Sequence, residues 1–280
     1  MHPALAKVAV AVVTGGASGI GLAAVCHLAA AGMRICVVDL PGPTLDAACA
    51  QAVTAGATEQ DVIAVAADVS EVAQLRALAD QVFSTFGGVN LLMNNAGIQP
   101  GSSIFDAEAN WDRILGVNLM GVVRSSQIFA PRMIDSGLPG LIVNTGSKQG
   151  ITTPPGDPAY NVSKAGVKVF TEALQHALRS IADCKVEARL FIPGFVFTPL
   201  TAGGRTEKPD GAWTPEETID FLFDSLERDD FYILCPDNDV SRDVDAKRIL
   251  WAAGDIVENR PPLSRWHPQF GDAFKEWLKA

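Results

Sequence analysis

Short apolar runs alternate with longer amphipathic stretches over most of this chain. The short runs are rich in Val, Ile and Leu, as the buried strands of a parallel sheet are. They predict strands near residues 8–13, 34–38, 62–66, 89–94, 140–145, 186–192 and 231–235. The amphipathic stretches predict helices near residues 19–31, 43–55, 70–86, 106–135, 159–182 and 215–228. This alternation predicts an α/β fold, in which a doubly wound, mainly parallel seven-stranded sheet carries helices on both faces.

Turn residues mark the ends of several predicted helices. Ser70 is expected to be the N-cap of the third helix, while Gly32 and Gly56 are expected at the C-terminal ends of the first two. The chain has 280 residues and no internal repeat, so we expect a single domain over residues 1–280.

The last third of the chain departs from the alternation. Residues 198–214 have the glycine and proline content of a loop, and Thr214-Pro215-Glu216-Glu217 predicts the start of a helix. An insertion after the sixth strand lies beside the carboxyl ends of the strands, where open α/β sheets bind ligands. Residues 198–228 are therefore predicted to form a mobile substrate lid. The tail, residues 236–280, is expected to contain a short helix near 270–279 and to pack against the body or a neighbouring subunit.

Composition narrows the possible partners and the compartment. Lys and Arg number 22 against 32 for Asp and Glu, and the net charge of −10 argues against nucleic acid and anionic membranes. The five cysteines form no Cys-x-x-Cys pair, so reduced thiols in the cytoplasm are the simplest interpretation. No apolar run approaches the ~20 residues that span a bilayer. The four histidines are scattered, without the spacing of metal ligands, and we expect no metal site.

A glycine-rich segment follows the first predicted strand and begins the first predicted helix. It runs from Thr14 to Gly21 with the spacing Gly-x-x-x-Gly-x-Gly. Glycines let the backbone approach a pyrophosphate closely, and the N-terminus of a helix stabilises its negative charge. The glycine pattern alone also fits an ordinary turn. Its position between strand and helix favours a nucleotide site.

Tyr160 and Lys164 are four residues apart and share one face of a predicted helix. An ammonium beside a phenol favours the phenolate, and tyrosine needs such help to exchange protons near neutral pH. Ser147 follows the fifth predicted strand, where its hydroxyl is able to hold a substrate oxygen, although a loop serine often has no such task. Asn118 lies inside a long helical stretch, where asparagine is unfavourable and indicates a local kink or a polar role.

In this order and spacing, the motifs resemble those of the short-chain dehydrogenase/reductase family. The matching residues lie in roughly the first 200 and comprise Thr14 to Gly21, Asp68-Val69, Asn94 to Gly97, Asn118, Ser147, Tyr160 with Lys164, and Pro193-Gly194 with Thr198. The resemblance implies a single-domain Rossmann fold. The Val-Asp-Gly-Gly segment that often closes such chains is missing, and the segment from Phe231 to Cys235 and a long tail stand in its place.

The resemblance implies four catalytic residues and a nicotinamide cofactor. Tyr160 is the expected general acid/base, Ser147 orients the substrate oxygen, Lys164 lowers the pKa of the tyrosine and binds ribose, and Asn118 holds a water in a proton relay. The expected cofactor-binding residues are Gly15, Ser18, Gly19, Ile20, Gly21, Asp39, Asp68, Val69, Asn95, Ala96, Gly97, Tyr160, Lys164, Pro193, Gly194, Val196 and Thr198.

Asp39 favours NAD as that cofactor. It ends the second predicted strand, roughly 20 residues after the glycine turn, where a carboxylate binds the adenosine ribose and repels a 2′-phosphate. Gly16, Ser18 and Leu40 occupy positions where NADP-binding members of the family often carry a cation. Asp39 is also placed to cap the helix that follows, and both roles are compatible.

The substrate is expected to be a small secondary alcohol or ketone. Residues that follow strand ends or lie in the lid are the candidates for its pocket: Ser147, Gln149, Tyr160, Phe195 and Trp213. Each aromatic residue among them has core packing as its alternative. The lid residues Phe221 and Phe223 are further candidates for closing the pocket over the substrate.

Two other functions stay open at this point. A ketoreductase acting on carrier-bound acyl chains is disfavoured by the acidic charge and by Asp39. A non-catalytic NAD-binding sensor or scaffold is disfavoured because all four catalytic-type residues are present. The resemblance also implies a homodimer or homotetramer assembled through the helices near 106–135 and 159–182.

Overall fold

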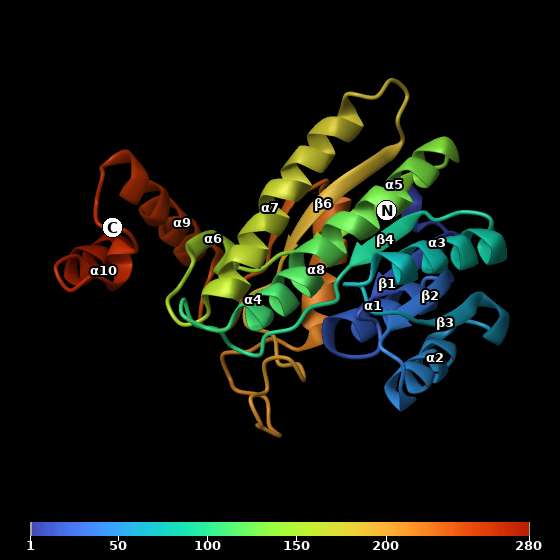
Figure 1. Cartoon of the computed structure of the whole chain (residues 1–280), viewed down its shortest axis with the longest axis horizontal. Coiled ribbons are helices and arrows are strands. Elements are labelled where there is room, and N and C mark those ends of the chain that lie inside the picture. The colour runs from blue at the N-terminus through green and yellow to red at the C-terminus, as the bar shows by residue number, and fades with distance from the viewer. Residues whose placement is uncertain (1, 280) are drawn as a thin grey trace.

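The computed structural model describes residues 2–279, which form a parallel seven-stranded sheet between layers of helices (Figure 1). Met1 and Ala280, the two ends of the predicted domain, lie outside the described residues. The strands are β1 (Val10–Thr14), β2 (Arg34–Asp39), β3 (Val62–Ala66), β4 (Leu91–Asn94), β5 (Gly140–Thr145), β6 (Val186–Ile192) and β7 (Tyr232–Leu234). Their spatial order is β3-β2-β1-β4-β5-β6-β7, and each adjacent pair is parallel. The predicted Rossmann fold is confirmed.

Helices cover both faces of this sheet. One face carries α1 (Gly19–Ala30), α2 (Pro43–Ala55) and α8 (Pro215–Glu227), and the other carries α3 (Val72–Phe86), α5 (Gly121–Asp135) and α7 (Pro158–Arg179). The shorter elements are α4 (Glu108–Leu115), α6 (Gln149–Thr152), the π-helical turn η3 (Gly116–Met120) and the 3₁₀ turns η1 (Pro3–Leu5) and η2 (Glu59–Asp61). The chain ends with α9 (Arg242–Val257), η4 (Ser264–Trp266) and α10 (Gly271–Lys279).

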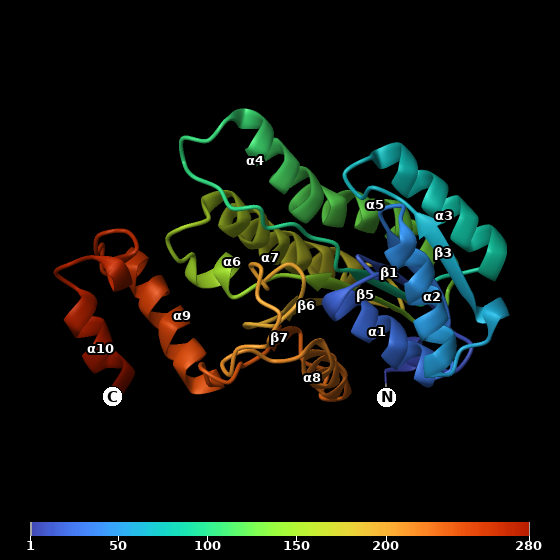
Figure 2. The ribbon, with the colours of Figure 1, turned by 90° about the horizontal axis from the view of Figure 1, so that it is seen from below.

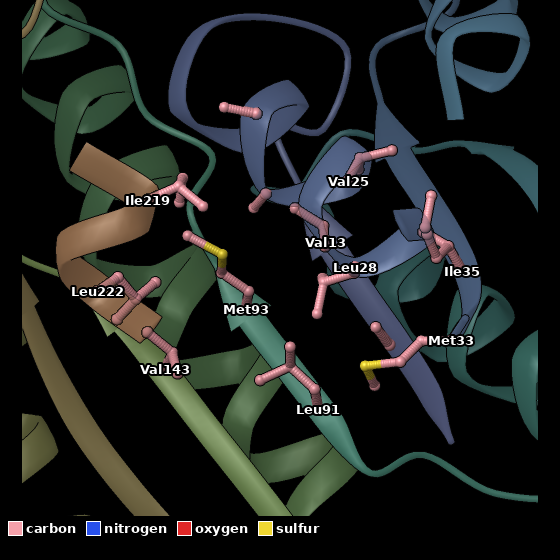
Figure 3. Close-up of a cluster of buried hydrophobic side chains, with 14 of the residues drawn as sticks. Val13, Val25, Leu28, Met33, Ile35, Leu91, Met93, Val143, Ile219 and Leu222 are labelled. Carbon is pink, nitrogen blue, oxygen red and sulfur yellow. The ribbon is translucent and has the colours of Figure 1, made fainter. Parts of the chain in front are cut away.

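The core on the α1 and α8 side shows how the alternating strand residues are used. Val13 of β1 and Met93 of β4 point toward this side, where Leu28 of α1 and Leu222 of α8 cover them (Figure 3). Their neighbours Val12 and Leu92 belong to the core on the opposite face. Both faces of the central strands are therefore buried, which explains why these strands are continuous apolar runs.

The predicted helix over residues 106–135 is interrupted. α4 and α5 are separated by η3, and Asn118 lies in this π-helical turn, which interrupts the regular helix at the residue whose presence indicated a local kink or a polar role. The N-cap prediction for Ser70 is wrong, because Glu71 occupies the N-cap position of α3 and Ser70 donates its hydroxyl to Asp68 instead. Gly56 is the C-cap of α2, whereas Gly32 lies one residue beyond the C-cap of α1.

The predicted lid is only partly an exposed loop. Residues 199–209 lie on the surface, but α8 packs its inner face into the core, with Ile219 and Leu222 each 1% exposed. Phe223 stacks on His27 of α1 with ring centroids 4.0 Å apart. Phe221 packs against the same core, so neither aromatic closes over the cleft. The helical part of the predicted lid is packed into the core, and its mobility stays a prediction.

The C-terminal tail contains a long helix that the sequence analysis did not predict. α9, η4 and α10 form an arm at the edge of the molecule, seen at the left of Figure 2. The arm has its own small core, in which Trp251 contacts Phe274 and donates its indole N–H to Ser264 Oγ at 2.7 Å. α9 meets the body at α6, where Ile249 and Ile151 pack in the same apolar cluster. The predicted short helix near 270–279 is α10.

Several global properties follow from the described residues. The five cysteines are all free, with Cys36 and Cys235 buried and the other three half-buried. Among residues 2–279, no helix is both long and apolar enough to cross a membrane. In the same range no group of three or more His, Cys, Asp or Glu side chains is arranged to hold a metal ion.

Candidate active site

A cleft of about 250 Å³ opens at the carboxyl ends of the strands, where the strand order reverses between β1 and β4. Open α/β sheets bind their ligands at this point, because the chain leaves neighbouring strands in opposite directions there. Most of the predicted site residues line the cleft, although they come from widely separated segments. The cleft reaches from Asp39 and Asp68 at one end to Tyr160 and Ser147 at the other.

The glycine turn brings backbone close to the cleft. Gly15 has a φ of +64° and faces Ala96, whose Cα lies 2.8 Å from where a Cβ on Gly15 would be. Gly19 has a φ of +51° and faces the Thr198 side chain. Ser18 is the N-cap of α1 but makes no side-chain cap, and the first amides of a helix have no partner within it. The turn therefore presents backbone donors to an anion.

Asp39 lies at the end of β2 and is held by two backbone amides. Its Oδ2 accepts from the N–H of Ala17 at 2.9 Å, and its Oδ1 accepts from the N–H of Leu40 at 2.8 Å. The carboxylate therefore fixes the glycine turn while it lines the cleft. The next residue, Leu40, is 57% exposed and uncharged, so this position offers no cation to compensate the carboxylate.

The middle of the cleft is built on Asp68, Val69 and the segment after β4. Asp68 accepts from both the N–H and the hydroxyl of Ser70. Thr14 Oγ1 accepts from the amides of Asn95 and Ala96, which fixes this segment against β1. Gly97 also lines the cleft. A Cβ there would lie 3.4 Å from Asn118 Oδ1 and 3.8 Å from Lys164 Nζ, so the backbone at Gly97 lies close to both side chains.

Tyr160 and Ser147 face each other at the far end of the cleft. Tyr160 is in the first turn of α7 and is 7% exposed. Ser147 follows β5 and is fixed by the short helix α6, because its Oγ accepts the N–H of Gln149 at 3.2 Å. That contact leaves the Ser147 hydroxyl proton for a ligand oxygen or for Tyr160.

Lys164 lies one helical turn after Tyr160, and its ammonium is held by main chain. Nζ donates to the Thr145 carbonyl at 2.8 Å and lies 5.8 Å from the centroid of the Tyr160 ring. Asn118 is completely buried behind it, and its amide exchanges two hydrogen bonds with the Ile98 backbone, of 2.8 and 2.9 Å. A π-helical turn leaves backbone groups without regular helical partners. Asn118 Oδ1 and Lys164 Nζ both lie near Gly97, and the Asn118 amide is also 3.4 Å from Ser163 Oγ.

Burial controls the protonation of both groups. It raises the pKa of Tyr160 to about 12, a hydrogen bond with Ser147 opposes this rise, and the Asp157 carboxylate adds to it. Burial also lowers the pKa of Lys164 to about 8. The sequence argument that Lys164 lowers the pKa of Tyr160 was therefore incomplete, because it counted the ammonium charge and omitted the loss of water from both groups.

The lowered pKa of Lys164 predicts a pH dependence of stability. Its pKa is 10.5 in the unfolded reference and about 8 in the fold, so between these values the unfolded chain binds the proton more strongly. The free energy of unfolding should therefore rise with pH in this window, by about 1 kcal/mol per pH unit. Urea unfolding of the wild type and Lys164→Met at pH 8, 9 and 10 isolates this contribution. A difference between the two proteins that stays constant with pH would contradict it.

Five predicted residues do not line the cleft. Gly21 packs against Gly15, Asn118 is completely buried, and Gln149 reaches Ser147 only through its backbone N–H. Phe195 and Trp213 are joined by a hydrogen bond from the Trp213 N–H to the Phe195 carbonyl. The proposed substrate contacts of Gln149, Phe195 and Trp213 therefore lack support from their positions.

Trp213 is held in place by its surroundings. Its indole N–H donates to Asn238 Oδ1 at 3.0 Å, and its ring lies against Phe221. Sequence reasoning also missed several lining residues, which lie at the ends of β2 and β5, in the segments after β2, β3, β5 and β6, or in η3: Val38, Leu40, Ala67, Val117, Thr145, Gly146, Pro199, Leu200 and Thr201. Except for Val117, their position at or after the carboxyl ends of strands was the available signal.

Comparisons with known proteins agree with this geometry. Residues 9–209 match the model of the family described as short chain dehydrogenase. The 1-deoxy-11-beta-hydroxypentalenate dehydrogenase of Streptomyces avermitilis is 33% identical over 80% of this chain and 83% of its own length. The 3-oxoacyl-(acyl-carrier-protein) reductase FabG of Thermotoga maritima is 32% identical over 69% of this chain and 76% of its own.

Solved structures show the same similarity. A short chain dehydrogenase/reductase from Burkholderia phymatum in complex with NAD superimposes with a TM-score of 0.82 at 31% identity, covering 94% of this chain and 98% of that one. The apo form of LigD from Sphingobium sp. strain SYK-6 gives a TM-score of 0.75 at 27% identity, covering 90% and 97%. The chain belongs to the short-chain dehydrogenase/reductase family of oxidoreductases.

Proposed function

We propose that this protein is an NAD-dependent oxidoreductase that interconverts a secondary alcohol and a ketone. The observation that carries the proposal is one cleft with Asp39 at one end and Tyr160 beside Ser147 at the other, with Lys164 next to the tyrosine. The same cleft thus combines a nucleotide-type glycine turn with a proton-transfer group.

The cleft residues fit a dinucleotide. A Cβ on Gly15 would press against Ala96 and one on Gly19 against Thr198, so glycine at both positions keeps the turn close to the residues across the cleft, and its backbone amides would bind the pyrophosphate. Asp39 would bind the adenosine ribose, Asp68 and Val69 would flank the adenine, and Pro193 to Thr198 would hold the nicotinamide end. NAD, when bound, accepts or supplies the hydride.

The protein residues supply position and a proton. With a pKa of about 12, the Tyr160 phenol is protonated at neutral pH, which is the form that donates to a ketone oxygen. Ser147 donates to the same oxygen and stabilises the charge that develops there. In the oxidative direction the Tyr160 phenol first gives up its own proton, which Lys164 and the backbone at Asn118 pass toward solvent, and the resulting phenolate takes the hydroxyl proton of the alcohol.

We expect NAD to be preferred over NADP by at least ~10-fold in kcat/KM, or about 1.4 kcal/mol. The reason is that Asp39 repels a 2′-phosphate. Leu40→Arg is the cleanest variant, because Leu40 is exposed and Asp39 also holds the glycine turn through Ala17. Kinetics with both cofactors should show the preference eroded in Leu40→Arg. Equal kcat/KM with NAD and with NADP in the wild type would contradict the role assigned to Asp39.

Because one relative is a 3-oxoacyl-(acyl-carrier-protein) reductase, a ketoreductase acting on carrier-bound acyl chains is the alternative function. An acidic carrier prefers a basic surface, and this chain carries a net charge of −10. A direct comparison of kcat/KM for free secondary alcohols or ketones and for carrier-bound 3-oxoacyl chains separates the two substrate classes. Higher kcat/KM for the carrier-bound chain would replace the proposed substrate class, and no turnover of either would favour a non-catalytic NAD-binding role.

We also propose that the protein is a cytoplasmic homodimer or homotetramer. The long helices α5 and α7 lie side by side on one face, and α7 exposes Val162 and Val169, which are 48% and 62% accessible. Burial of these residues against a second copy would remove apolar surface from water.

A further inference from the structure

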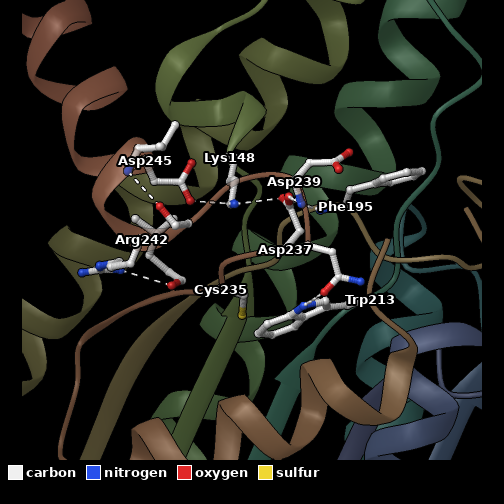
Figure 4. A network of polar contacts seen from close by, with 12 residues as sticks. Lys148, Phe195, Trp213, Cys235, Asp237, Asp239, Arg242 and Asp245 are labelled. Atoms are coloured by element: carbon white, nitrogen blue, oxygen red, sulfur yellow. Dashed lines mark hydrogen bonds and ion pairs between the residues drawn. The ribbon is translucent and has the colours of Figure 1, made fainter. Parts of the chain in front are cut away.

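Lys148 directly follows Ser147 and joins three parts of the chain in a buried ion network. Its Nζ lies 3.0 Å from Asp237 Oδ2 and 2.6 Å from Asp245 Oδ2 (Figure 4). The two carboxylate side chains are each 5% exposed and that of Lys148 is 15% exposed. Nothing in the proton transfer described above uses this network.

Asp237 connects Lys148 to the nicotinamide side of the cleft. The Oδ2 atom that contacts Lys148 also accepts the N–H of Phe195 at 3.2 Å. Gly194 lies against both groups, because a Cβ there would be 2.6 Å from Asp237 Oδ2 and 3.1 Å from Lys148 Cε. One carboxylate oxygen therefore holds the segment after β6 against the residue that follows Ser147.

Asp245 connects the same lysine to the C-terminal arm. It lies in the first turn of α9, and Ser241 caps that helix by accepting the Val244 N–H. Ile249, one turn further along α9, packs with Ile151 of α6. Since α6 is the helix that orients Ser147, α9 contacts the catalytic end of the cleft through an ion pair and an apolar contact.

The neighbouring loop fixes the segment after β6 from its other side. Asn238 accepts from the Trp213 indole and donates to the Ala212 carbonyl at 3.2 Å. Trp213 is in turn linked to the segment after β6, because its backbone carbonyl accepts the N–H of Phe197 at 2.9 Å. Residues 236–240 therefore touch both sides of the strand end that faces the nicotinamide position.

We propose that Lys148, Asp237 and Asp245 are positioning residues, through which the C-terminal arm holds Ser147 and the segment Pro193 to Phe195 at a fixed separation. The inference rests on the proposed function for its kinetic consequence. Buried ion pairs often contribute little net stability, but they admit few alternative geometries. Reacting groups must be held within about 0.5 Å for efficient catalysis. The arm thus acts on turnover without touching substrate or cofactor.

The test compares two carboxylates of α9. Asp245→Asn removes the charge that binds Lys148, whereas Asp255→Asn breaks a similarly buried pair with Arg260, 2.9 Å away, inside the arm. We expect Asp245→Asn to lower kcat at least tenfold with the dissociation constant for NADH changed less than twofold. Asp255→Asn should lower the melting temperature but keep kcat within twofold of the wild type.

Hydrogen–deuterium exchange supplies a readout that does not depend on activity. Asp245→Asn should speed exchange in residues 147–152 and 193–197, and Asp255→Asn should not. Unchanged exchange in both segments would overturn the positioning role, whether or not the wild type oxidises alcohols. Equal kcat in Asp245→Asn and the wild type would overturn it as well.

A conservative variant covers the case in which Asp245→Asn does not fold. Asp245→Glu keeps the charge, and Lys148 has a flexible stem that can meet a displaced carboxylate. We expect Asp245→Glu to retain at least a third of the wild-type kcat and its protection from exchange. An Asp245→Glu enzyme that folds but is as slow, and exchanges as fast in residues 147–152 and 193–197, as Asp245→Asn would contradict the role assigned to the ion pair.

Discussion

Tyr160→Phe is expected to lower kcat by about 10²–10⁴-fold and to leave NADH binding nearly unchanged. The hydroxyl transfers the proton, while the ring, 7% exposed in the first turn of α7, supplies packing that Phe preserves. Steady-state kinetics gives kcat, and NADH fluorescence titration gives the dissociation constant. The separation of the two effects distinguishes a chemical role from a structural one.

The second tyrosine provides a matched control. Tyr232 is 48% exposed and donates its hydroxyl to Glu172 Oε1 at 2.6 Å, and neither residue lines the cleft. Tyr232→Phe removes the same atom and should keep kcat within twofold of the wild type. A Tyr160→Phe enzyme with more than half of the wild-type kcat would refute the role assigned to Tyr160.

Gly21→Ala is expected to destabilise the fold and to weaken NADH binding at least tenfold. A Cβ at residue 21 would lie 2.0 Å from the Gly15 carbonyl oxygen and 2.7 Å from the Asn95 side-chain amide. Because the closer contact is the backbone of the turn itself, the turn must move, and overpacking of this kind costs about 1–3 kcal/mol. Urea unfolding and NADH titration measure the two losses.

A second helical glycine tests whether the contact, and not helix propensity, is responsible. Gly271 begins α10, and a Cβ there would meet nothing within 4 Å. Gly271→Ala should change the free energy of unfolding by less than about 1 kcal/mol, in the stabilising direction. If Gly21→Ala were as mild as Gly271→Ala, Gly21 would not be required for the close approach.

The body of the fold was predictable because its local signals agree with one another. β1, β4 and β5 are buried on both faces and therefore consist of continuous apolar runs. Pro215 and the capping box between Thr214 and Glu217 fix the start of α8. The prediction for Ser70 failed because its hydroxyl donates to Asp68 and its oxygen caps no helix amide N–H.

The tail was less predictable because several apolar residues of α9, among them Leu250, Ile256 and Val257, are exposed, so the apolar residues do not mark one buried face. α9 contains alternating charges, and its inner side includes Asp245, whose partner Lys148 is distant in sequence. The same limit applied to Trp213, whose role in fixing the loop after β6 depends on Asn238. Long-range polar pairs leave no periodic pattern, so only the folded chain reveals them.

The sequence predicted which residues meet in the cleft better than it predicted the pKa values of those residues. The residues that follow strand ends, from Gly15 to Thr198, do meet in one cleft. The pKa values of Tyr160 and Lys164 depend on how much water the fold removes, which spacing along a helix does not encode. Their chemical roles stay predictions.

Transfer of a deuterium label tests the central claim most directly. The enzyme is incubated with NAD and a panel of aromatic and alicyclic secondary alcohols that carry deuterium on the hydroxyl-bearing carbon. The proposed function predicts deuterated NADH by mass spectrometry with at least one alcohol, and none with Tyr160→Phe over the same time. NADH binding by a wild type that transfers no deuterium from any alcohol, and none from deuterated NADH to the matching ketones, would contradict it.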